Sequence, residues 1–142
     1  MRSDRLQRLI TLKERLMEEK ERLLDRHIRE MDSILSNIEM LDNEVEKNYH
    51  DLCTRCLDGN EFASLKNYLE YLKRLKAEAV AQKTLVEQKI AVIRAELCEM
   101  LKEVKTLDAL KKRTLSAAKR AENKKLQKLL DEIALRLDSR KT

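Results

Sequence analysis

The feature that most constrains the fold is an almost unbroken helical pattern, because the 142 residues include no proline and a single glycine, Gly59. Proline breaks helices and glycine weakens them, so their near absence permits very long helices. Charged residues make up 40% of the chain and aromatic residues 3%, which is typical of coiled coils and unlike a sheet. The apolar share is too high for a disordered chain and too low for a broad core. We therefore predict an all-α protein whose apolar side chains line a narrow seam.

The only break in this pattern is Asp58-Gly59-Asn60. Gly59 can take the left-handed conformation that ends a helix, while Asp58 or Asn60 can cap the next helix. The sequence thus predicts one coiled-coil hairpin over residues 1–142, with a first helix at about 4–57, a turn at 58–60 and a second helix at about 61–137. A parallel dimer of straight chains is the alternative, and Gly59 argues against it.

A spacing of three and four residues, typical of coiled coils, runs through both predicted helices. In the first it selects Leu24, Ile28, Met31, Leu35, Ile38, Asp42, Val45, Tyr49, Leu52 and Cys56. In the second it selects Leu65, Leu69, Leu72, Lys76, Ala79, Lys83, Val86, Ile90, Ile93, Leu97, Met100, Val104 and Leu107. A turn at Gly59 places residue i opposite residue 120 minus i, and hence Asp42 near Lys76. We interpret this pair as one that sets the register.

The two predicted helices are unequal in length. The first can cover the second only to about Ala118, so roughly 20 residues, on the order of 30 Å, extend as a carboxyl-terminal helical overhang. This segment still carries an apolar stripe, formed by Leu126, Leu130, Ile133 and Leu137. Because the stripe lacks an intramolecular partner, we expect it to dock onto another molecule.

The spacing of His50, Cys53 and Cys56 invites a zinc-site interpretation. Residues three apart on a straight helix drift around its axis, however, and no second ligand pair follows the turn. We predict no metal, no disulfide and no cofactor, and we assign Cys56 to the seam. A two-helix protein also lacks the concave pocket that catalysis needs, so we expect neither an enzyme nor a small-molecule substrate.

No apolar stretch approaches the ~20 residues that a membrane span requires, so we predict no transmembrane segment. The amino-terminal residues lack the apolar core of a secretory signal. These observations favour a cytoplasmic protein.

All four aromatic residues, Tyr49, Phe62, Tyr68 and Tyr71, surround the predicted turn. Tyr49 falls on the counted seam and is predicted to fill the core. Phe62 and Tyr71 lie off it, and exposed aromatic residues there are candidate anchors for a partner protein.

Charge is also uneven, since residues 61–142 hold 20 Lys and Arg against 12 Asp and Glu. The basic residues cluster in Lys111-Lys112-Arg113, Lys119-Arg120 and Lys124-Lys125. Three interpretations remain open: a solvated helix face, a contact with an acidic protein socket, or a contact with nucleic-acid phosphates. The absence of interleaved aromatic residues disfavours nucleic acid.

Four segments together resemble a known family. They are residues 65–75 (LKNYLEYLKRL) followed by Gln82, residues 94–97 (RAEL), residues 105–111 (KTLDALK) and residues 130–134 (LDEIA). Their order and distance from the turn are similar to the bacterial flagellar export protein FliJ and its YscO-like relatives in type III secretion. Cys53 and Cys56 are not part of the family pattern. Lys76 and Lys83 make the seam more polar than expected.

The resemblance implies a non-enzymatic, stalk-like component of the flagellar or type III export apparatus, cytoplasmic and peripherally associated with the inner membrane. Its implied partners are the hexameric export ATPase, the export-gate membrane protein and export chaperones. The residues implied to meet the gate are Phe62, Tyr68, Tyr71 and Leu75. Those implied to meet the ATPase are Lys111, Lys112, Arg113, Lys119, Arg120, Leu126, Leu130, Ile133 and Leu137. The alternatives are a generic coiled-coil adaptor or tether and a basic nucleic-acid-binding hairpin.

Overall fold

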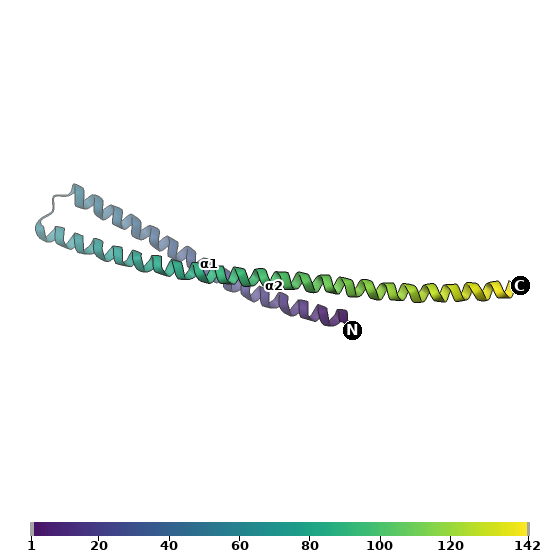
Figure 1. Ribbon diagram of the computed structural model, residues 1–142. Helices are drawn as coiled ribbons and strands as arrows, with labels where there is room; N and C mark the ends of the chain where they lie inside the picture. Colours follow the sequence, from purple (N-terminus) through teal and green to yellow (C-terminus); the bar gives the residue numbers. More distant parts are fainter. Residues whose placement is uncertain (1, 142) are drawn as a thin grey trace. The chain divides into compact units, whose positions relative to one another are not determined.

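The computed structural model describes residues 2–141, and within that range it contains two helices and no strand (Figure 1). Helix α1 spans Arg2–Thr54 and helix α2 spans Gly59–Lys141. Contacts divide the chain into two units. The tip unit is Glu19–Leu97, and the terminal unit combines the residues up to Glu18 with the chain from Cys98 onward. In each unit α1 packs against α2, which confirms the prediction of an all-α helical hairpin.

The connection between the helices comprises residues 55–58, earlier than the predicted 58–60. Asp58 caps α2, because its Oδ1 atom accepts a hydrogen bond of 2.8 Å from the backbone N–H of Glu61. Its carbonyl oxygen accepts the next bond, from Phe62 N–H at 3.0 Å. The expected left-handed conformation of Gly59 is wrong, since no described glycine has positive φ and Gly59 is the first residue of α2.

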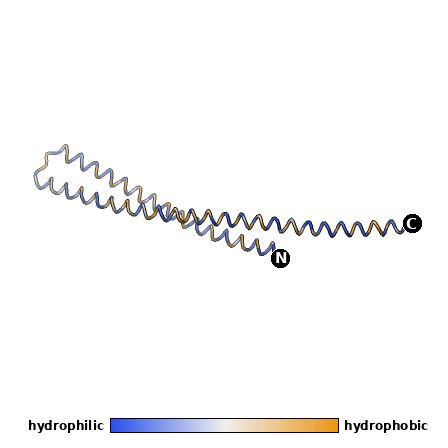
Figure 2. The backbone as a smooth tube through the Cα atoms, viewed as in Figure 1, coloured by the Kyte–Doolittle hydropathy of each residue, from blue (hydrophilic) through white to orange (hydrophobic). Residues whose placement is uncertain are grey.

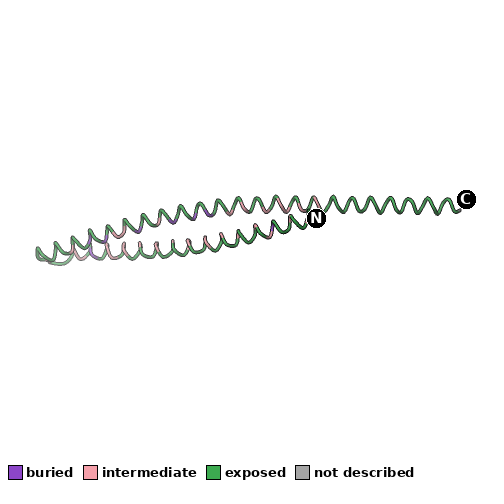
Figure 3. The backbone as a smooth tube through the Cα atoms, turned by 90° about the horizontal axis from the view of Figure 1, so that it is seen from below, coloured by how far each residue is buried: buried purple, intermediate pink, exposed green. Residues whose placement is uncertain are grey.

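The predicted seam of α2 is confirmed. Six of its residues are at most 9% exposed, namely Leu69, Leu72, Ala79, Val86, Ile90 and Ile93. The other predicted positions, including Lys76 and Lys83, are half-buried. Apolar and polar residues alternate along both helices (Figure 2), and burial follows this spacing (Figure 3). The seam holds one row of side chains from each helix, as expected for a two-helix coiled coil.

The predicted seam of α1 is correct at seven of its ten positions. The half-buried residues are Leu24, Ile28, Met31, Ile38, Asp42, Val45 and Leu52. At two other positions the buried residue lies one place earlier in the sequence, since Ile34 and Asn48 are more buried than Leu35 and Tyr49. Cys56 is exposed in the connection and is not a seam residue. The shift arises because steps of three and four residues both return close to the same face of a helix.

Ion pairs across the seam fix the register. Lys76 Nζ lies 2.5 Å from Asp42 Oδ1, which confirms the predicted proximity of these two residues. Two more pairs join the helices, Lys20 with Glu96 in the tip unit and Lys13 with Glu103 in the terminal unit. The residue numbers of the three pairs add up to 118, 116 and 116, so the pairing is displaced by two to four residues from the predicted 120 minus i.

Asn48 is the one described polar residue that is buried, at 9% exposure. Its amide nitrogen donates hydrogen bonds to the carbonyl oxygen of Glu44 at 2.6 Å and to Glu44 Oε1 at 3.3 Å. Both acceptors lie on the same helix, so α2 does not supply a partner for this amide. A polar amide at a seam position favours one alignment over others at some cost in stability.

Candidate functional surfaces

The candidate partner-binding residues form two surfaces, one in each unit. The aromatic patch is defined by Phe62, Tyr68, Tyr71 and Leu75 in the tip unit. The overhang is defined as residues 115–140 of α2 in the terminal unit. Neither surface is part of the seam, apart from the half-buried Leu75.

The aromatic patch is exposed but only partly contiguous. Tyr68 and Tyr71 are 41% and 49% exposed, and their rings stack with centroids 6.5 Å apart and an interplanar angle of 30°. The spacing of Tyr68, Tyr71 and Leu75 places these three residues on one face of α2. Phe62 is also exposed, at 48%, but lies roughly a third to a half of a turn away from them around the helix. The structure therefore brings together three of the four predicted residues.

Tyr49 does not fill the core as predicted. Its ring is 40% exposed, and Lys73 Nζ lies 5.2 Å from the ring centroid, in cation–π range. The cause is the shifted seam of α1, which buries the neighbouring Asn48 instead.

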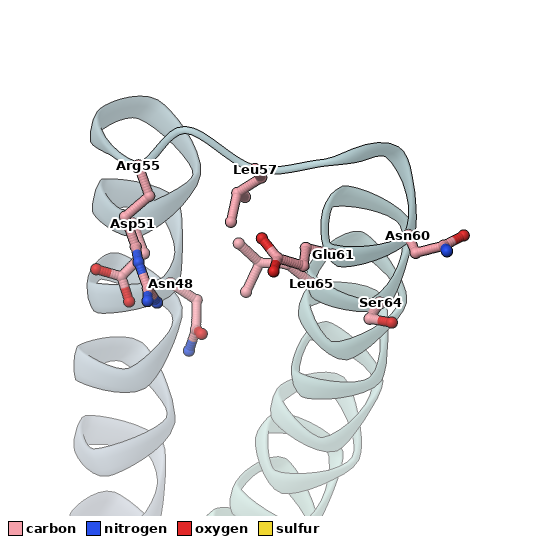
Figure 4. A pocket seen from close by; sticks show the side chains of 8 residues that line it. All are labelled: Asn48, Asp51, Arg55, Leu57, Asn60, Glu61, Ser64 and Leu65. Atoms are coloured by element: carbon pink, nitrogen blue, oxygen red, sulfur yellow. The ribbon is translucent and has the colours of Figure 1, made fainter.

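The end of the tip unit encloses an open cavity of about 580 Å³ below the connection (Figure 4). Leu57 points from the connection into the space between the helices, where Leu65 points toward it from α2. Asn48, Asp51, Arg55 and Glu61 add polar groups to the lining. Apolar and charged side chains thus both line this cavity.

The overhang is exposed along its whole length. The last half-buried residue of α2 is Thr114, close to the predicted limit at Ala118, and every described residue from Leu115 to Arg140 is exposed (Figure 3). The stripe residues Leu126, Leu130, Ile133 and Leu137 are 58%, 59%, 48% and 54% exposed. Leu129, which lies beside the stripe, is 55% exposed, and Leu135, on the opposite face of the helix, is 70% exposed.

The stripe does not continue the seam. Counting on from Thr114 with the seam's spacing of four and three gives Ala118, Ala121, Lys125, Lys128, Glu132 and Leu135. These positions are small or charged up to Glu132, and such residues are unsuited to a coiled-coil seam. The stripe therefore lies on a nearly opposite face of the helix, suited to a partner other than a continuation of α1.

The predicted basic residues fall into two groups. Lys111 is half-buried and donates a hydrogen bond of 2.5 Å to Gln7 Oε1, and Lys112 Nζ lies 3.3 Å from Asp108 Oδ2. Arg113, Lys119 and Arg120 are exposed. Among the side chains of residues 2–140, no ion pair involves these last three residues. They are thus the ones available to an acidic partner.

Cys53, Cys56 and Cys98 are exposed free cysteines. Across the described part of the chain, no three His, Cys, Asp or Glu residues gather in a way that could hold a metal ion. Neither described helix contains a segment long and apolar enough to cross a bilayer.

This fold and these surfaces define a class of protein, the long helical hairpins whose functional surfaces are exposed helix faces. Within it, the family model described as Flagellar FliJ protein matches residues 1–142, the whole chain. The chain belongs to the FliJ family, as its resemblance predicted, and is therefore a component of the flagellar protein export apparatus. Searches of curated proteins and of solved structures gave no match.

Proposed function

We propose that this protein engages two partners of the export apparatus, the hexameric export ATPase through the overhang and the export gate through the aromatic patch. The observation that carries the proposal is the leucine stripe, which is exposed on a helix that continues beyond its intramolecular partner. An apolar stripe of this size on a helix is a typical element of helix-in-groove recognition. In this role the chain performs no catalysis, works in the cytoplasm beside the inner membrane, and contributes to the handling of export chaperones.

Basic residues at the start of the overhang and just before it also support a contact with the ATPase. Arg113, Lys119 and Arg120 are exposed and free of ion pairs within residues 2–140, and they precede the leucine stripe along the helix. Basic side chains accelerate association with an acidic surface, and an apolar stripe then supplies the area that is buried. A ring of ATPase subunits with acidic and apolar contact residues is the complementary surface.

The ATPase contact is tested by measuring the rate of ATP hydrolysis and the ring assembly of the cognate export ATPase with and without this protein. Leu130→Glu places a charge in the stripe, so we expect it to abolish most of the stimulation. Leu85→Glu is the matched control, because Leu85 is 57% exposed against 59% for Leu130 and lies in the tip unit.

If neither hydrolysis nor ring assembly responds to the unmodified protein, the ATPase assignment is wrong and a generic adaptor or tether becomes the better description. Duplex DNA binding that Lys111→Glu, Lys112→Glu and Arg113→Glu together abolish would instead favour the nucleic-acid interpretation.

The gate contact is tested by the binding of the soluble part of the gate protein. Tyr71→Ala removes an exposed stacked ring, so we expect affinity to fall by about tenfold or more. Tyr49→Ala is the control, because Tyr49 is similarly exposed and lies outside the patch. Equal losses for the two variants would contradict the assignment of the aromatic patch.

A further inference from the structure

The beginning of α1 is apolar on two neighbouring faces. Leu6, Ile10 and Met17 point into the seam, where Ile10 is 5% exposed. Leu9, Leu12 and Leu16 form a second row with spacings of three and four residues, and they are 40%, 54% and 39% exposed. A helix that is apolar over such a wide arc typically packs against two neighbours. In the terminal unit α2 supplies only one.

The second row borders a groove that α2 completes. The groove has a volume of about 310 Å³ and is lined by Arg2, Arg5, Leu6, Leu9, Leu110 and Thr114. Leu110 is 48% exposed, so apolar side chains from both helices face this space. Leu12 and Leu16 continue the row beyond the groove along α1. The apolar surface thus extends from Leu9 to Leu16, about 10 Å along the helix axis.

The charged residues that line the groove are both basic. Arg2 and Arg5 line it, and neither forms an ion pair with a side chain of residues 2–140. The guanidinium group presents its donors in a planar fork that matches a carboxylate. Because the whole chain carries a formal net charge of +5, like-charge repulsion opposes a second copy as the occupant.

We propose that this groove is a docking site for an acidic amphipathic helix of a partner protein. Leucine-type side chains at positions i, i+3 or i+4, and i+7 of that helix pack against Leu9, Leu12, Leu16 and Leu110. Carboxylates at one end of it pair with Arg2 and Arg5, and the result is a local three-helix arrangement in the terminal unit. The site is separate from the overhang and the aromatic patch, so it does not depend on the function proposed for them.

The test uses the full chain and a fluorescent synthetic helix of about 18 residues, a length of five turns, with leucine at i, i+3 and i+7 and glutamate on its flanks. A second peptide replaces every glutamate with lysine. Fluorescence anisotropy is expected to show the acidic peptide binding at least about tenfold more tightly than the lysine peptide. The preference is expected to shrink as salt is added.

Two variants locate the site. Leu12→Glu and Arg5→Glu are each expected to weaken binding of the acidic peptide by about tenfold, because one inserts a like charge and the other reverses an attractive one. Leu137→Glu and Arg120→Glu make the same changes on the overhang, where Leu137 is 54% exposed like Leu12. These two controls are expected to stay within about twofold of the unmodified protein. Circular dichroism confirms that all four variants keep their helicity.

Three results would overturn the proposal. Equal affinity for the two peptides would contradict an acidic partner. Equal losses of affinity in the groove variants and their overhang controls would contradict binding at the groove. Sedimentation equilibrium that shows self-association, abolished by Leu12→Glu, would assign the groove to a second copy of the chain.

Discussion

Two stretches of the same helix, α2, have opposite relations to their surroundings. Between Leu65 and Thr114 a regular row of residues is buried or half-buried against α1, whereas every described residue from Leu115 to Arg140 is exposed. Both stretches are helical and both carry leucines at helical spacing. Helix formation thus depends mainly on local sequence, while burial depends on whether α1 lies alongside. The covered stretch stabilises the fold, and the overhang leaves its apolar stripe available to a partner.

The strongest test of this contrast places the same charge in each stretch. Ile93→Glu buries a carboxylate at a position that is 6% exposed, so we expect it to lower the free energy of unfolding by more than about 3 kcal/mol. Leu130→Glu is expected to change it by less than about 0.5 kcal/mol. Thermal melting followed by circular dichroism measures both. Comparable losses would mean that the overhang is packed against the rest of the molecule.

Hydrogen exchange compares the two stretches without any mutation. A helix without packing partners opens more readily than one held by a seam, because tertiary contacts supply most helix stability. Amides in residues 118–138 should therefore exchange at least about a hundredfold faster than those in residues 86–97, a difference of about 2.7 kcal/mol. Mass spectrometry of deuterated peptides measures the rates. Similar protection in both segments would contradict the difference in packing between the covered stretch and the overhang.

Asn48 allows a smaller effect to be measured within the seam. Asn48→Leu replaces a buried amide with an apolar side chain, so we expect stability to rise by about 1 kcal/mol. The same substitution should make the alignment of the helices less specific. Sedimentation velocity should then detect additional associated species at high concentration. Denaturant unfolding measures the gain. A lower stability with a single species in solution would show that the amide is needed for packing.

The ion pair of Asp42 and Lys76 is expected to have the smallest of these effects on stability. Both side chains are more than 40% exposed, so solvent screens the pair and its coupling free energy should be about 0.5 kcal/mol. A double-mutant cycle with Asp42→Ala and Lys76→Ala measures it, and the coupling should decrease as salt is added. A coupling above about 2 kcal/mol would instead indicate a pair that is shielded from solvent.

The sequence predicted the α2 seam correctly at every position from Leu65 to Leu107 and the α1 seam at seven of ten positions, and the reason lies in the residues themselves. Along α2 each seam position has one clear apolar or basic candidate, so the spacing has a single solution. Along α1, Ile34 and Leu35 are both apolar, and Leu41 precedes Asp42, so two stripes fit the same period. The prediction does not include the groove at Leu9 or the row of Leu9, Leu12 and Leu16, because the predicted seam begins at Leu24. The row of leucines was visible in the sequence and could have revealed it.

What the sequence determined by itself was the helical hairpin, the proximity of Asp42 and Lys76, the exposed overhang and the family. These depend on local periodicity, on the one break near Gly59 and on the unequal lengths of the two helices. The tertiary structure alone decided which face of α1 is buried, since a step of three or four residues is settled only by the side chains that α2 presents. It also decided that Asn48 rather than Tyr49 enters the seam, and that Arg2 and Arg5 meet Leu110 at one groove. Contacts between residues about a hundred positions apart depend on the register, which no local pattern fixes.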